Sequence, residues 1–406
     1  MKGQAFEEIS VPAIPGSEIS YGFAMMAGLP THLSFFGKAS AIGAILLLWK
    51  VGAVAADLPP SLREATIPPL EWQNQGGAYR SPLLFRDGSR VTNGQDWQRR
   101  RAEILSEWQT RLGQWPPVLE KPTLEILSST QREGITQQRV RVQIAPDQHG
   151  EGYLLIPANA QNLAAVFVPF YEPETSVGLA GKPWRDFAWQ LARRGFVTLS
   201  LGSPGGDARK PVMSSKAQCQ PLSYLAYVSA NAWQALAQLP FVDAQRIGIV
   251  GHSYGGKWAM FGACLWPKYA CGAWSDPGIV FDESRASINY QEPWYLGLDP
   301  KVTRAPGLVS ADRPRTGAYR TLIEKGHDLV ELQALMAPRP FLVSGGAEDP
   351  PKRWMALNHI RAVYELLGHD SRVAMSNRES HDPNESSNEL IYTFFEHWLK
   401  TKRSSD

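Results

Sequence analysis

The pentapeptide GHSYG at residues 251–255 is the only G-x-S-x-G in the chain. It directly follows the apolar run Ile247 to Val250 and directly precedes a helical stretch that includes Ala259 to Phe261. On a sharp strand-to-helix turn a serine adopts an unfavourable backbone conformation, and side chains two residues away on either side would collide. The pattern therefore predicts that Ser253 is a nucleophile whose hydroxyl is exposed above a sheet.

The chain around this motif alternates between apolar strands and helical stretches, which favours a parallel sheet buried on both faces. Before it, Val140, Val142 and Ile144 alternate with polar residues as in a half-buried antiparallel strand. An antiparallel start and a parallel continuation predict the α/β-hydrolase fold, with a mostly parallel central sheet and helices on both faces. The predicted parallel strands are Ala164 to Phe170, Phe196 to Leu201, Arg246 to Ser253, Ala270 to Ser275, Pro340 to Gly346 and Arg372 to Asn377.

The same pattern divides the chain into three parts. Residues 1–56 are a leader, and residues 57–122 are an extended and helical lead-in with a helix over roughly Gly94 to Leu112. Residues 123–406 form the catalytic domain, which carries a long irregular insertion at about 278–335. The three cysteines, Cys219, Cys264 and Cys271, show no CxxC spacing, so a metal site is not expected from them. In an exported protein two of them could form one disulfide, and three buried thiols are the alternative.

The leader contains an apolar run from Ala39 to Trp49, followed by the small residues Val54 to Ala56. These features are typical of a secretory signal and its cleavage site. The run is shorter than the roughly 20 residues that span a bilayer. We therefore expect an exported protein, periplasmic or extracellular, without a stable membrane span after processing. An uncleaved N-terminal anchor and a disordered leader are the alternatives.

A serine nucleophile needs a base and an acid, which in this fold follow it along the chain in the order acid, then histidine. His381 lies in a polar loop between the last apolar strand and the last helix, and we predict that it is the base. Asp349, after the strand Pro340 to Gly346, is the preferred acid. Its neighbour Glu348 and the alternative Asp276, at the end of the preceding strand, remain open.

Two backbone N–H groups are expected to bind the oxyanion, from Tyr254 and from Tyr171 in the loop after Phe170. No metal and no other cofactor is needed for this chemistry. Since 41 basic residues nearly balance 39 acidic ones and no long basic run is present, a nucleic-acid partner is not expected.

Several segments resemble known esterases. FVDAQRIGIVGHSYGGKWA is similar to the nucleophile region of dienelactone hydrolases and acetylxylan esterases. SRASINYQEPWYLG, HDLVELQALMAPRPFLVSGGAEDP and the lead-in WQRRRAEILSEWQTRLGQWPP resemble bacterial glucuronoyl esterases. The resemblance implies Ser253 as nucleophile, His381 as base and Lys257 as a sugar contact. It also supports Asp276 as an alternative acid. The nucleophile motif of glucuronoyl esterases is similar to G-C-S-R-x-G-K, whereas this chain has His252 and Tyr254 beside the serine.

The insertion also contains Trp294, between Tyr290 and Tyr295, as a candidate for stacking on a sugar ring. Our leading hypothesis is a serine hydrolase that cleaves carboxylic esters through an acyl-enzyme, with a small-molecule or polysaccharide ester as substrate. A serine peptidase of the prolyl-oligopeptidase type would use the same turn and the same order of residues. The residues before Thr123 are too few for that family's propeller domain. A non-catalytic binding module on a hydrolase scaffold would not require all three residues of a triad.

Overall fold

The computed structural model of the chain describes residues 58–400. The predicted leader and its cleavage site lie outside these residues, so export and processing stay predictions. Within the described part, no helix combines the length and the apolar character needed to cross a membrane.

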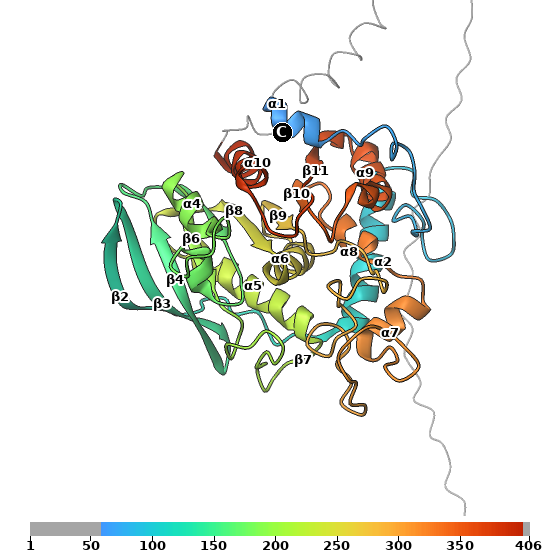
Figure 1. Cartoon of the computed structure of the whole chain (residues 1–406), viewed down its shortest axis with the longest axis horizontal. Coiled ribbons are helices and arrows are strands. Elements are labelled where there is room, and N and C mark those ends of the chain that lie inside the picture. Colours follow the sequence, from blue (N-terminus) through green and yellow to red (C-terminus); the bar gives the residue numbers. More distant parts are fainter. Residues whose placement is uncertain (1–57, 401–406) are drawn as a thin grey trace, which may run out of the picture. The chain divides into compact units, whose positions relative to one another are not determined.

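A nine-stranded sheet forms the centre of the described part, with the strand order β11-β10-β9-β8-β5-β6-β4-β3-β2 (Figure 1). The six strands β11, β10, β9, β8, β5 and β6 are parallel to one another, and β4, β3 and β2 continue the sheet in antiparallel pairs. The bounds are β2 (Leu124–Arg132), β3 (Ile135–Ala145), β4 (Gln148–Ile156), β5 (Leu163–Phe167), β6 (Val197–Leu201), β8 (Val242–His252), β9 (Cys271–Ser275), β10 (Phe341–Gly345) and β11 (Val373–Asn377). This arrangement confirms the predicted mostly parallel sheet with an antiparallel start.

Helices cover both faces of the sheet, as the alternation of strands and helices predicts. They are α1 (Pro60–Ala65), α2 (Gly94–Leu112), α3 (Pro173–Ser176), α4 (Phe187–Arg193), α5 (Pro221–Ala237), α6 (Tyr254–Leu265), α7 (Gly317–Glu324), α8 (Leu329–Ala334), α9 (Trp354–Leu366) and α10 (Glu385–Phe395). The short helices η2 (Pro351–Arg353), η3 (Asp370–Arg372) and η4 (Glu396–Lys400) and a two-stranded ribbon of β1 (Gly113–Gln114) and β7 (Gln218–Cys219) complete the described elements.

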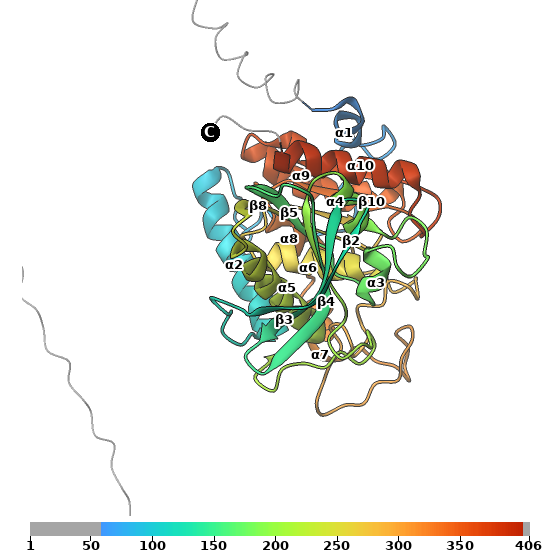
Figure 2. The ribbon, with the colours of Figure 1, turned by 90° about the vertical axis from the view of Figure 1, so that its left-hand side faces the viewer.

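The core consists of two hydrophobic clusters, one on each face of the sheet. Strand β5 shows the division, because Ala165 and Phe167 belong to one cluster while Ala164 and Val166 belong to the other. The first cluster includes side chains from α2, α5, α6, α8 and α9, and the second includes side chains from α1, α4 and α10. Figure 2 shows α1 lying against α10. Burial on both faces explains why these strands are continuously apolar in the sequence.

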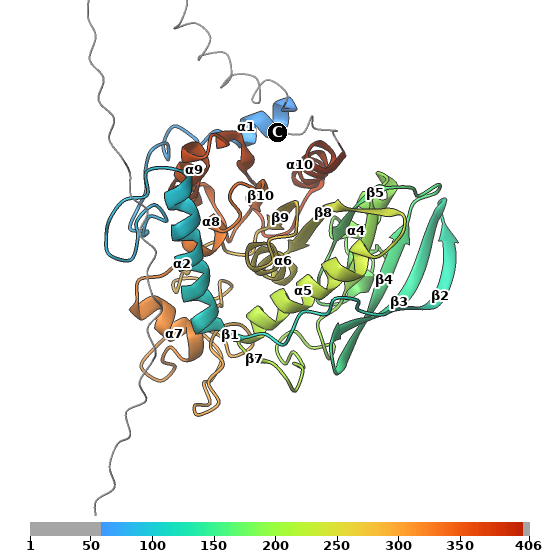
Figure 3. The same cartoon turned by 180° about the vertical axis from the view of Figure 1, so that it is seen from behind.

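Helix α2 packs into the same core as the sheet. Trp97, Ile104 and Trp108 are fully buried in the first cluster, and the buried Arg100 forms an ion pair with Glu331 of α8 at 2.7 Å. Figure 3 shows α2 running past α8 and α7. The predicted bounds of this helix agree with the structure.

Helices α1 and α7 are short, and the sequence pattern did not indicate them. Helix α1 lies within the lead-in segment expected to be extended, and α7 lies within residues 278–335, expected to be irregular. Helices of six to eight residues complete about two turns, which is too short for a clear apolar repeat.

Candidate active site

Ser253 occupies a strained turn between β8 and α6. Its φ of 56° lies in the left-handed region, which residues other than glycine rarely adopt. A Cβ atom on Gly251 would lie 2.0 Å from the carbonyl oxygen of Gly255, and one on Gly255 would lie 2.2 Å from that of Pro169. Both positions therefore require glycine, and this close approach explains the spacing of the motif.

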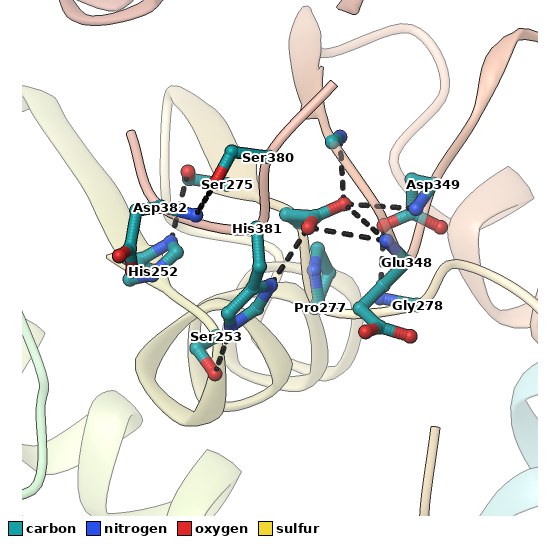
Figure 4. A network of polar contacts seen from close by, with 12 residues as sticks. His252, Ser253, Ser275, Pro277, Gly278, Glu348, Asp349, Ser380, His381 and Asp382 are labelled. Carbon is teal, nitrogen blue, oxygen red and sulfur yellow. Dashed lines mark hydrogen bonds and ion pairs between the residues drawn. The ribbon is translucent and has the colours of Figure 1, made fainter. Parts of the chain in front are cut away.

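His381 bridges Ser253 and Asp276, and Figure 4 shows the His381 ring beside Ser253. Its Nε2 lies 2.9 Å from Oγ of Ser253, and its Nδ1 lies 2.7 Å from Oδ2 of Asp276. The three residues follow β8, β9 and β11, whose carboxyl ends meet at the same edge of the sheet. A serine hydroxyl beside one ring nitrogen and a carboxylate beside the other can move a proton from the serine to the imidazole.

Asp276 is fully buried and anchored by the loop that follows β10. Its carboxylate accepts hydrogen bonds from the backbone N–H groups of Gly346 (2.7 Å) and Asp349 (2.8 Å), and Glu348 N lies 3.1 Å from Oδ1. Its own backbone has a φ of 51°, a second strained position in the site. The loop thus holds one carboxylate oxygen while the other contacts His381.

Asp349, the acid preferred from the sequence, binds elsewhere. Its carboxylate oxygens accept hydrogen bonds from Gly278 N (2.8 Å) and Ile279 N (2.6 Å). Burial, together with the negative charge of Asp276, raises the pKa of Asp349 to about 6. The difference from the expectation has a geometric reason: residues 346–349 wrap around the Asp276 carboxylate, so that the backbone of Asp349 faces Asp276 and its side chain faces away. Glu348 forms an ion pair with Arg285 at 3.0 Å.

Two neighbours of His381 were not singled out as functional from the sequence. Arg378 donates hydrogen bonds to the carbonyl oxygen of His381 (2.7 Å) and to that of Ser344 (2.9 Å), so it ties the histidine loop to β10. The ring of His252 lies 4.8 Å from that of His381, and burial lowers the pKa of His252 well below its usual value, which keeps this ring neutral. The sequence signal that could have indicated a role for Arg378 is its position three residues before the predicted base, His381.

The two residues expected at the oxyanion site lie side by side. Tyr254 begins α6, where the first backbone N–H groups have no partner within the helix. Tyr171 follows β5, which pairs with β8. The two rings stack, with their centroids 4.6 Å apart. Tyr171 is 38% exposed, whereas Tyr254 is buried.

The predicted sugar contacts have different surroundings. Lys257 is buried; its Nζ donates to the carbonyl oxygen of Pro277 and lies 4.4 Å from the centroid of the Tyr290 ring. Burial lowers the pKa of Lys257 to about 8. Trp294 is half-buried and packs against Tyr295. Contact of Lys257 or Trp294 with a substrate stays a prediction.

One group within residues 58–400 has the composition of a metal site. Ligand atoms of Glu107, His327 and Glu331 all lie within 4.8 Å of one another. Each carboxylate already binds an arginine, Arg86 for Glu107 at 2.8 Å and Arg100 for Glu331 at 2.7 Å. None of these residues belongs to the strand ends that carry Ser253. Cys219, Cys264 and Cys271 are buried free thiols.

Comparisons with known proteins bear on the fold. No protein-family model matches the chain, and no curated protein matches it. A glucuronoyl esterase from Solibacter usitatus superimposes with a TM-score of 0.61 at 18% identity, over 79% of this chain and 97% of that one. A promiscuous CE15 esterase from a marine bacterial metagenome gives a TM-score of 0.60 at 15% identity, over 85% and 99%. A CE15 glucuronoyl esterase from Caldicellulosiruptor kristjansonii gives 0.55 at 19% identity, over 84% and 97%. The chain therefore has the α/β-hydrolase fold that the sequence predicts.

Proposed function

We propose that this protein is a serine hydrolase that cleaves carboxylic esters through an acyl-enzyme. The observation that carries the proposal is the continuous hydrogen-bonded path from Ser253 Oγ through His381 to Asp276, with distances of 2.9 Å and 2.7 Å. Such a path gives an ordinarily weak nucleophile both a base and an orienting acid.

In the proposed mechanism Ser253 Oγ attacks the ester carbonyl carbon while His381 Nε2 takes the hydroxyl proton. Asp276 holds the ring through Nδ1 and stabilises the imidazolium that forms. The tetrahedral intermediate collapses when His381 returns the proton to the departing alcohol oxygen, which leaves an acyl group on Ser253. A water molecule, deprotonated by His381, then attacks this acyl group, and the acid departs as His381 returns the proton to Ser253 Oγ.

The proposed substrates are esters of sugars or of polysaccharides. Support comes from the fold neighbours, which are named as glucuronoyl esterases and as a promiscuous CE15 esterase. Tyr171 also lines a cavity of about 310 Å³, together with Ser203 and mainly polar and glycine residues that include parts of β3 and β4. Exposed polar groups of this kind suit a hydroxyl-rich ligand. Export by the N-terminal leader would bring the enzyme to such material.

The departure from G-C-S-R-x-G-K matters for the choice of ester. Tyr254 occupies the position of the arginine in the glucuronoyl-esterase pattern, and its side chain is buried. We therefore propose acylated sugars, such as acetyl esters, ahead of glucuronate esters. Hydrolysis of acetylated xylan and of a methyl glucuronate ester, compared at equal enzyme concentration, tests this order; faster cleavage of the glucuronate ester would reverse it.

The decisive experiment labels the purified protein with a fluorophosphonate probe and follows hydrolysis of p-nitrophenyl acetate, for wild type and Ser253→Ala. We expect labelling and turnover in wild type and neither in the variant, with unchanged thermal unfolding. A folded Ser253→Ala protein with full turnover would overturn the mechanism. A folded wild type with no labelling and no turnover would favour a non-catalytic binding module instead.

A further inference from the structure

Lys257 lies one helical turn after the nucleophile, and its charged end is enclosed by the protein. Its backbone N–H donates to the carbonyl oxygen of Ser253 at 3.0 Å, and the residue is only 4% exposed. The ammonium group donates to the carbonyl oxygen of Pro277. It also lies 4.4 Å from the centroid of the Tyr290 ring and 5.8 Å from that of Tyr295. A carbonyl and two aromatic rings therefore surround the charge.

The carbonyl group that Lys257 binds belongs to the turn that carries Asp276. Pro277 directly follows Asp276, and it has no N–H group with which to fix the turn. Its buried carbonyl oxygen accepts from Lys257, and the Tyr290 hydroxyl lies 3.4 Å away. Asp276 has a φ of 51°, a conformation that persists only where the surroundings impose it. Lys257 supplies part of that restraint.

Helix α6 and this turn are in direct contact. A Cβ atom on Gly256 would lie 3.1 Å from the carbonyl oxygen of Ser275 and 3.2 Å from Cβ of Pro277. The backbone N–H of Ser253 donates to the same carbonyl oxygen of Ser275 at 2.8 Å. The segment that contains the nucleophile thus binds the chain on both sides of Asp276, through Ser253 N before it and through the Lys257 ammonium after it.

We propose that Lys257 is a positioning residue that holds Asp276 in place against His381. It does so by fixing the turn at Pro277 to the helix that follows the nucleophile. This inference rests on the proposed ester hydrolysis, and it gives Lys257 a role inside the protein in place of the sugar contact that the resemblance implies. Without the ammonium, the turn would shift and the carboxylate would orient the imidazole less well, which slows proton transfer from the serine.

The two roles of Lys257 predict different kinetics for Lys257→Met. The substrate p-nitrophenyl acetate contains no sugar, whereas acetylated xylan does. If Lys257 positions Asp276, kcat should fall by about 10- to 100-fold on both substrates, with little change in KM. If it contacts a sugar, KM should rise on acetylated xylan alone, and hydrolysis of p-nitrophenyl acetate should stay at the wild-type rate. That second pattern would overturn the proposal.

Lys268→Met is the matched control. Lys268 follows the end of the same helix and also lies over aromatic rings, 4.9 Å from the centroid of Trp233 and 5.2 Å from that of Trp266. It is exposed and does not contact the turn at Pro277. The control should retain wild-type kcat on both substrates.

A double-mutant cycle tests whether Lys257 acts through Asp276. In an Asp276→Asn background the carboxylate is already lost, so Lys257→Met should lower kcat by less than threefold further. A further loss as large as in the wild-type background would mean an independent structural effect and would overturn the proposal. The kcat values are expressed per site labelled to completion by a fluorophosphonate, so that unfolded protein is not counted.

The remaining outcomes also decide between the roles. A folded Lys257→Met enzyme with wild-type kcat on both substrates would overturn the proposal. If Lys257→Met does not fold, Lys257→Gln is judged by the same criteria, because its amide nitrogen lies one bond closer to the backbone and carries no charge. Fluorophosphonate labelling of wild type that depends on Ser253 would survive each of these results, so failure of this inference is distinguishable from failure of the proposed hydrolase function.

Discussion

The backbone N–H of Asp349 lies 2.8 Å from Oδ1 of Asp276, so one candidate acid supports the other. The carboxylate of Asp349 is occupied by the backbone N–H groups of Gly278 and Ile279, directly after the segment that carries Asp276. The two carboxylates are therefore not interchangeable: Asp276 contacts His381, the proposed base, and Asp349 braces the loops around Asp276.

This division predicts different results for Asp276→Asn and Asp349→Asn. Loss of the charge at Asp276 removes the group that orients His381 and stabilises its protonated form. We expect kcat for p-nitrophenyl acetate to fall by about 10⁴-fold, as for other triad acids. Asp349→Asn should keep kcat within about tenfold of wild type and lower the free energy of unfolding by about 1–3 kcal/mol, since an amide cannot accept both backbone hydrogen bonds. The reverse ranking of the kcat values would identify Asp349 as the acid.

Arg378 should act on the rate through the position of His381. In Arg378→Ala, the loop that carries the base loses its ties to β10. We expect kcat to fall by about 10- to 100-fold, in the range of effects from displaced catalytic groups, with little change in KM. Added guanidine should restore part of the lost kcat by occupying the vacated site. A variant with normal kcat would show that the loop holds its place without the arginine.

The buried ammonium of Lys257 should make stability depend on pH. Its pKa in the folded protein, about 8, is below the usual 10.5, because burial disfavours the charge. Between these values the unfolded chain binds more protons than the folded protein, so the free energy of unfolding should rise with pH across this window. Lys257→Met should lack this increment. Urea unfolding of both proteins at each end of the window checks the sign, and parallel slopes would contradict it.

The Arg100–Glu331 ion pair should anchor α2 to α8. Both side chains are buried, so Arg100→Met leaves a buried carboxylate without its main partner and should lower the free energy of unfolding by about 3–5 kcal/mol. The neighbouring Arg99 pairs with Asp96 on the surface and is the matched control. Arg99→Met should unfold close to wild type. Equal unfolding curves for the two variants would argue against the anchor.

The parts of the candidate site that depend on local pattern could be predicted from the sequence. Ser253 sits in a motif whose strand, turn and helix are contiguous, and His381 lies in the loop between the last strand and the last long helix. The choice between Asp276 and Asp349 depends on how two loops from adjacent parallel strands fold around each other. Both residues follow apolar strands, so their local sequence does not distinguish them.

The side-chain contacts across the site could not be predicted from the sequence either. The burial of Lys257 against Pro277 and Tyr290, and the stacking of Tyr171 on Tyr254, join segments 20 to 83 residues apart in the chain. Periodicity reports which face of an element is apolar, and it carries no information on such pairings.

The Asp276 carboxylate has a consequence for how activity arises as the chain folds. Its partners come from positions 70 to 105 residues further along, in the loops after β10 and β11. A chain synthesised only as far as α9 would already contain Ser253, Asp276 and most of the parallel sheet, yet it would lack His381, the proposed base. Strand β11 is the last strand in the chain and lies at an edge of the sheet. During refolding, the first ester turnover would therefore report the docking of β11, a late step of assembly, and not the earlier hydrophobic collapse of the chain.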